Sequence, residues 1–175
     1  IKMTSLGNYA SASVLECNDL IVRNLTNTLT SVYGQFDLSQ NVLAQSSLTT
    51  IGNWKPTSIL KNVAVLAGVQ GNEKFYVTQA GLYEVGVNLA IDNASSDITR
   101  CDCNVVLYPS TTIVGGSVTQ KGGGADWIKE TLNVMVQFEI TDPTTQYFEI
   151  EGRVSGSGTP NYTTNFTQVF VKKLI

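Results

Sequence analysis

Short runs of alternating apolar and polar residues, separated by turn residues, fill the chain from residue 31 onward. A period of two places successive side chains on opposite faces of a β-strand. Nearly every break contains Gly, Pro, Asn or Asp, which favour turns. The pattern predicts strands at 32–42, 48–54, 58–69, 74–77, 82–91, 101–108, 113–119, 131–140, 147–154 and 166–175.

The same alternation predicts which side chains enter the core. In the run from 82 to 91 the core set is Tyr83, Val85, Val87, Leu89 and Ile91. In the run from 131 to 140 it is Leu132, Val134, Val136, Phe138 and Ile140. In the run from 147 to 154 the core set is Phe148, Ile150 and Val154.

Eight to ten antiparallel strands without a credible long helix predict an all-β sandwich or barrel over residues 31–175. Residues 1–30 show no sustained periodicity, so we expect an irregular N-terminal arm or tether there. Composition agrees with this class, since charged residues make up only 14% of the chain and strand-favouring Thr and Val are abundant.

Charge and composition exclude several functions. A net charge of −3, with 11 Lys and Arg spread thinly, offers no basic patch for nucleic acid. The longest apolar run, 63–69, is far shorter than the roughly 20 residues that span a bilayer. We expect no signal peptide in the given sequence, because residues 1–5 lack a following apolar stretch; the alternative is a leader that has been removed. Without histidine, the Cys101-x-Cys103 pair lacks the partners of a metal site. We expect no cofactor and three free thiols.

The sequence gives little support for catalysis. It has no histidine for acid–base chemistry, no Gly-x-Ser-x-Gly motif and no phosphate-binding Gly-rich loop. Glu149 and Glu151 share a strand face at roughly 7 Å, a spacing that a glycosidase could use. Exposed acidic alternation is far more common, and we predict a non-enzymatic protein.

One motif carries a family resemblance. Phe75-x-Val77-x3-Gly81-x-Tyr83, followed by a hydrophobic strand, resembles the signature of the globular head of complement's first component, a branch of the tumour-necrosis-factor-like jelly rolls. Gly34-x-Phe36 near the start and a strand at the C-terminus fit the same order. The resemblance covers residues 31–175 and implies a jelly-roll sandwich of 8–10 strands that forms a compact homotrimer.

The resemblance also implies a subunit interface. The first, third, sixth and last strands, at 35–43, 82–91, 131–140 and 166–175, would form the inner sheet, whose non-core face meets neighbouring subunits. That face would carry Asn88, Ala90, Met135 and Gln137, together with an aromatic of the last strand, Phe166 or Phe170. The alternative is that both phenylalanines fill the core of the single subunit.

The loops offer a second candidate surface. If the strands alternate in direction, the longer connections at 92–100, 120–129 and 155–165 lie at the distal end, and the short turns at 70–73, 109–112 and 142–146 lie at the base. Lys121, Asp126, Trp127 and Tyr162 would be the binding residues of the distal end. The alternative is a set of solvated loops in which Trp127 packs on its own sandwich.

Two departures from the family shape the functional hypothesis. The chain has no collagenous Gly-X-Y stalk before residue 31 and no matching calcium motif. Its Thr, Asn, Gly and Val bias and its arm look more like the trimeric heads of phage and viral fibres, spikes and vertices. We therefore expect a virion protein, held to other virion proteins through residues 1–30, with loops that bind a host receptor or glycan. The alternatives are a capsid-building or decorating subunit, and a secreted ligand or lectin-like domain.

Overall fold

The computed structural model describes residues 31–69, 71–92, 98–120 and 129–175, and residues 32–175 form one compact unit. Its elements are strands: β1 (Tyr33–Leu38), β2 (Val42–Leu43), β3 (Thr49–Thr50), β4 (Trp54–Lys61), β5 (Val63–Gly68), β6 (Gly71–Val77), β7 (Gly81–Asp92), β8 (Ile98–Tyr108), β9 (Thr112–Gln120), β10 (Lys129–Ile140), β11 (Tyr147–Gly156), β12 (Asn161–Tyr162) and β13 (Gln168–Lys173). The prediction of an all-β protein is confirmed.

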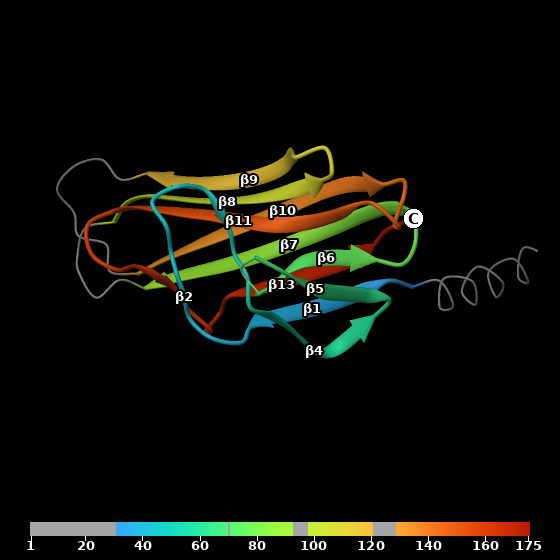
Figure 1. Ribbon diagram of the computed structural model, residues 1–175, viewed down its shortest axis with the longest axis horizontal. Coiled ribbons are helices and arrows are strands. Elements are labelled where there is room, and N and C mark those ends of the chain that lie inside the picture. Colours follow the sequence, from blue (N-terminus) through green and yellow to red (C-terminus); the bar gives the residue numbers. More distant parts are fainter. Residues whose placement is uncertain (1–30, 70, 93–97, 121–128) are drawn as a thin grey trace, which may run out of the picture. The chain divides into compact units, whose positions relative to one another are not determined.

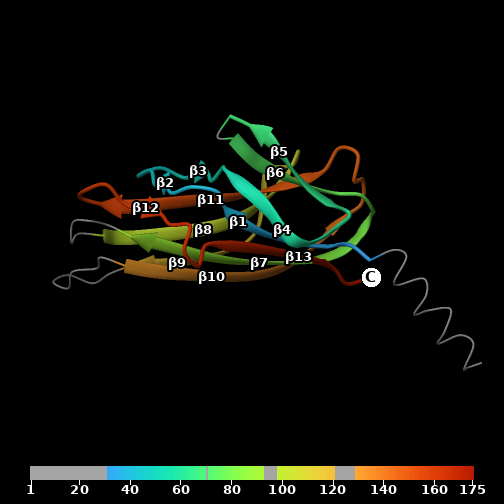
Figure 2. The same cartoon turned by 90° about the horizontal axis from the view of Figure 1, so that it is seen from below.

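The strands form two antiparallel sheets packed face to face, as Figures 1 and 2 show. Sheet A runs in the order β10, β7, β13, β1, β4, and the short strands β12 and β2 extend it beside the end of β7. Sheet B runs in the order β5, β6, β11, β8, β9, with β3 on β11. Strands distant in sequence are therefore neighbours, and this arrangement is a jelly roll.

The core lies between the sheets and follows the predicted alternation. Tyr83, Val85 and Leu89 of β7 are fully buried, and so are Phe148 and Ile150 of β11. Phe75 stands at the centre of an aromatic cluster. Its ring centroid lies 4.9 Å from Phe148, 5.1 Å from Phe36 and 5.9 Å from Trp54.

The turn between β6 and β7 explains the Phe75–Gly81–Tyr83 motif. Gly81 has a φ of 148°, and a Cβ there would lie 2.3 Å from the carbonyl oxygen of Ile175, so only glycine fits. Two residues on, the Tyr83 hydroxyl donates to the carbonyl of Gln79 at 2.6 Å and closes the turn. Gly81 therefore leaves room for the backbone of Ile175 beside β7, and Tyr83 holds the turn through its hydrogen bond to Gln79.

Several predicted boundaries are wrong. The runs at 32–42 and 48–54 each hold a break, and the run at 58–69 divides at Asn62, which has a φ of 59°. Asparagine tolerates this left-handed conformation better than most residues. Because the predicted strand at 58–69 is two strands, β4 and β5, the chain reverses direction once more than predicted. The connection between β5 and β6, predicted as the base turn at 70–73, therefore does not lie at the base. Gly71 lies beside Asn53, at the start of β4, whereas Asn62 accepts a hydrogen bond from Thr78 at the other end.

The other connections follow the prediction. Tyr108 pairs with Tyr147 beside the turns that follow β8 and β10, and Gly81 pairs with Ile140 at the same end. At the opposite end, Arg100 pairs with Ser155, and Asp92 pairs with both Lys129 and Asn161. The three longer connections therefore begin and end on one side of the sandwich.

Candidate functional site

The outer face of sheet A, which points away from the core, carries the candidate site. Strand pairing sets Met135 of β10 opposite Gly86 of β7, Gly86 opposite Phe170 of β13, and Phe170 opposite Gln35 of β1. These residues form one row across four strands. Met135 is 69% exposed and Phe170 is 39% exposed, so two large apolar side chains face outward from a sheet.

Gly86 lies at the centre of this row. A Cβ at this position would lie 3.2 Å from Cε of Met135 and 3.8 Å from Cδ2 of Phe170. Because glycine has no side chain, Met135 and Phe170 close over this position and leave Gly86 buried.

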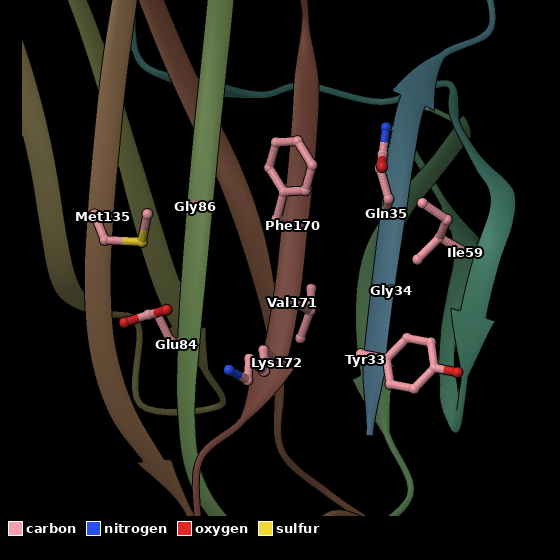
Figure 3. Close-up of a pocket in the computed structure, with 10 residues that line it drawn as sticks. All are labelled: Tyr33, Gly34, Gln35, Ile59, Glu84, Gly86, Met135, Phe170, Val171 and Lys172. Atoms are coloured by element: carbon pink, nitrogen blue, oxygen red, sulfur yellow. The ribbon is translucent and has the colours of Figure 1, made fainter. Parts of the chain in front are cut away.

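A shallow groove of about 530 Å³ crosses this face of sheet A, and Figure 3 shows the residues that line it. Its lining residues come from β1, β4, β7, β10 and β13: Tyr33, Gly34, Gln35, Ile59, Glu84, Gly86, Met135, Phe170, Val171 and Lys172. The exposed side chains of Tyr33 and Ile59 extend the apolar surface to β4. A contiguous exposed apolar patch on a sheet face is typical of an interaction surface.

Polar pairs border this apolar row on both sides. In one flanking row, the Gln137 amide donates to Glu84 at 3.0 Å, and Glu84 pairs in register with Lys172. In the other, the Gln168 amide donates to Asp37 at 3.1 Å. An apolar centre with a satisfied polar border is the composition of many protein–protein interfaces.

The structure brings most of the predicted interface residues together. Asn88, Ala90, Met135, Gln137 and Phe170 all lie on the outward side of sheet A. Phe170 belongs to β13 and is not a core residue, so that alternative is wrong. Ala90 is nearly buried, because the Thr167 hydroxyl accepts from its N–H at 3.0 Å and covers it.

Phe166 lies on the same side but outside any strand, since β13 begins at Gln168. Its φ is 67° and its side chain is 80% exposed. It lines a second hollow of about 210 Å³ with Ala90 and Thr131. An aromatic side chain in a strained, exposed position is uncommon, and Phe166 does not fill the core.

The predicted distal-loop residues do not form an observed site. Lys121, Asp126 and Trp127 lie outside the described residues. Tyr162 is 1% exposed, so its predicted role as an exposed binding residue is wrong. It belongs to the two-residue strand β12, whose pairing with β7 and β2 turns its ring into the core.

The cysteines of β8 are buried, and the glutamates of β11 bond to neighbouring side chains. Burial raises the pKa of the Cys101 and Cys103 thiols to about 12, and both are free, as predicted. Burial also raises the pKa of Glu149, although a hydrogen bond from the Thr50 hydroxyl at 2.7 Å opposes the shift. Glu151 accepts from the Tyr108 hydroxyl at 3.4 Å. Both carboxylates of the possible glycosidase pair are thus bonded to neighbouring side chains.

The described residues contain no cluster of three His, Cys, Asp or Glu placed to hold a metal ion. Within that same part of the chain, no helix is long and apolar enough to span a bilayer.

Sequence reasoning missed the groove itself. Gly86, Glu84 and Lys172 meet only through the β7–β13 register, and Tyr33 and Ile59 join them from β1 and β4. The one available signal was Gly86, a glycine in the middle of a long strand pattern, which often marks close approach or packing.

The order of the strands in the two sheets defines a jelly roll, and this fold is similar to solved TNF-like structures. The structure of Eiger TNF from S. frugiperda matches with a TM-score of 0.61 and 9% identity, over 83% of this chain and 93% of that chain. Two structures of murine APRIL, at pH 5.0 and pH 8.5, match with TM-scores of 0.58 and 0.57 and 10% identity, over 83% of this chain and all of theirs. At this identity the likeness shows the fold. No protein-family profile and no curated protein sequence matches the chain.

Proposed function

We propose that the chain forms a homotrimer through the outer face of sheet A. The observation that carries this proposal is the row Met135–Gly86–Phe170, an exposed apolar strip that polar pairs border on both sides. Burying such a strip against another copy removes apolar surface from water. The number of copies comes from the TNF-like resemblance, which implies three.

The interface residues in this proposal are Asn88, Ala90, Met135, Gln137, Phe166 and Phe170. Met135 and Phe170 would supply the apolar contacts at the centre. Phe166, presented beside Ala90 and Thr131, would contact the neighbouring subunit near the end of the sheet. A closed ring needs two different patches on each subunit, and the groove and the separate surface around Phe166 offer such a pair.

The trimer would act as a non-enzymatic structural and binding head on a virion, attached through residues 1–30. The low charged fraction and the Thr- and Val-rich strands support this location. The likeness to Eiger TNF and APRIL favours a second candidate, a secreted ligand of the same fold. The neighbouring genes would separate the two candidates. Capsid and tail genes beside this one would support the virion protein, and their absence would support the secreted ligand.

The distal end would be the contact surface, through Lys121, Asp126 and Trp127. The longer connections that follow β7, β9 and β11 all lie on that side. A glycan array with Trp127→Ala tests this part, and binding that survives the substitution removes Trp127 from the proposal.

Native mass spectrometry tests the trimer. One chain has a mass of 18.9 kDa, so a trimer has three times that mass. A single species of one chain at micromolar concentration would contradict the proposal.

A further inference from the structure

Two arginines meet one buried carboxylate on the outer face of sheet B. Asp102 of β8 points outward, because its neighbours Cys101 and Cys103 point into the core. Arg100 lies two residues away on the same strand, and Arg153 of β11 lies directly opposite Asp102. The Asp102 side chain is only 3% exposed.

The two guanidinium groups hold Asp102 in the same way. Arg100 Nε donates to both carboxylate oxygens, at 2.9 and 3.0 Å, and Arg153 Nε donates to Oδ2. Asp102 takes the Nε of each arginine, so a second acceptor would bind their terminal nitrogens. The Arg100 and Arg153 side chains are 39% and 26% exposed, so an acceptor can reach them from solvent.

Counted over the described residues, the three side chains carry one excess positive charge, since two arginines contact one aspartate. The other carboxylates on the outward side of β11 bond elsewhere, Glu149 with Thr50 and Glu151 with Tyr108. One further monoanion would balance the charge. Two guanidinium groups held side by side suit a planar or tetrahedral oxyanion, because each presents parallel N–H donors.

The surroundings suit a sugar. Gln120 of β9 and Ser155 of β11 lie opposite Arg100, and supply an amide and a hydroxyl. Val118 lies opposite Asp102 and is 54% exposed, so an apolar surface borders the arginines. Amide, hydroxyl and apolar groups around a charged centre are the contacts that sugar hydroxyls and ring carbons can use.

We propose that Arg100 and Arg153 form a binding site for the anionic group of a glycan, a carboxylate or a sulfate ester, and that Asp102 positions both arginines. Asp102 fixes the two long side chains before the ligand arrives, which lowers the entropic cost of binding. The site lies on sheet B, away from the proposed subunit interface, and therefore does not depend on trimer formation.

An NMR titration of the full chain tests this site with 3′-sialyllactose as the carboxylate probe, a heparin-derived disaccharide as the sulfate probe and lactose as the neutral control. Arg100→Lys and Arg153→Lys keep the charge beside Asp102 but lose the forked donors. Lys74→Gln removes a charge from the same sheet face and serves as the matched control. A thermal melt of each variant confirms that it folds.

We expect one or both anionic probes to bind and lactose not to bind. Each lysine variant should weaken binding by about tenfold, whereas Lys74→Gln should leave it unchanged. Which probe binds identifies the anion. The proposal is overturned if neither probe binds, if both lysine variants bind as well as the original chain, or if Lys74→Gln weakens binding equally. Binding of a tetraglutamate peptide with both glycans refused would also overturn it.

Discussion

Phe170 lies directly opposite Gly86 in the β7–β13 pair, with its ring beside a position that has no side chain. Met135 lies on the other side of Gly86, and the two side chains close over the glycine and present one exposed apolar surface. A neighbouring subunit that packs on this surface would remove it from water.

Met135 should oxidise slowly in the assembled protein. Its side chain is 69% exposed in the single subunit, and the proposed interface covers it. We expect hydrogen peroxide to convert Met135 to the sulfoxide several times more slowly in the original chain than in Phe170→Asp, as peptide mass spectrometry measures. Equal rates in the two proteins would place Met135 outside the interface.

Tyr162→Phe should stabilise the protein. The Tyr162 hydroxyl is buried without a hydrogen-bond partner among the described residues, and such a group costs about 1–3 kcal/mol. We expect the free energy of unfolding in urea to rise by about 1 kcal/mol. Tyr83→Phe is the matched control, since it removes a hydroxyl that does bond, to Gln79, and should lower the same quantity by about 1 kcal/mol. A loss of stability in Tyr162→Phe would contradict the assignment.

The core thiols should be unreactive in the folded chain. Burial raises the pKa of both Cys101 and Cys103 to about 12, so almost no thiolate exists at pH 8. In a Cys17→Ser background, iodoacetamide should label no cysteine in the native protein and two after unfolding. Labelling of the 101–103 peptide under native conditions would show that this part of β8 opens readily.

Glu149 should make stability depend on pH. Burial raises its pKa above the ordinary value of 4.5, so the folded state holds a proton that the unfolded state has released. Its contribution is therefore fully present below pH 4.5 and is lost as the pH rises through the folded-state pKa. We expect Glu149→Gln to be more stable than the original chain at pH 7, with a smaller difference at pH 4.5. Urea unfolding measures the stability of both proteins at the two pH values. A stability difference that grows toward acid pH would contradict the raised pKa of Glu149.

Much of the fold follows from the sequence because strand faces obey a strict period of two. The alternation from Tyr83 to Ile91 predicted the core side of β7, and the same register placed Asn88 and Met135 outward. The break at Asn62 escaped prediction because residues 57–67 around it contain no Gly or Pro. Tyr162 escaped it because a two-residue strand inside a polar loop leaves no periodic signal.

The candidate site was only partly predictable for a similar reason. Single-strand patterns place a residue on a face, but the groove depends on which residues stand opposite each other across β10, β7, β13 and β1. Asp102 shows the same limit, since its two arginine partners lie on different strands.

Sedimentation equilibrium of two matched variants tests the central claim most directly. Phe170→Asp places a charge in the proposed interface, and Leu66→Asp places one on an exposed apolar position of β5 in sheet B. We predict that the original chain and Leu66→Asp sediment as three chains of 18.9 kDa each, and that Phe170→Asp sediments as one folded chain. A trimer that survives Phe170→Asp, or an original chain that sediments as a monomer, would contradict the account.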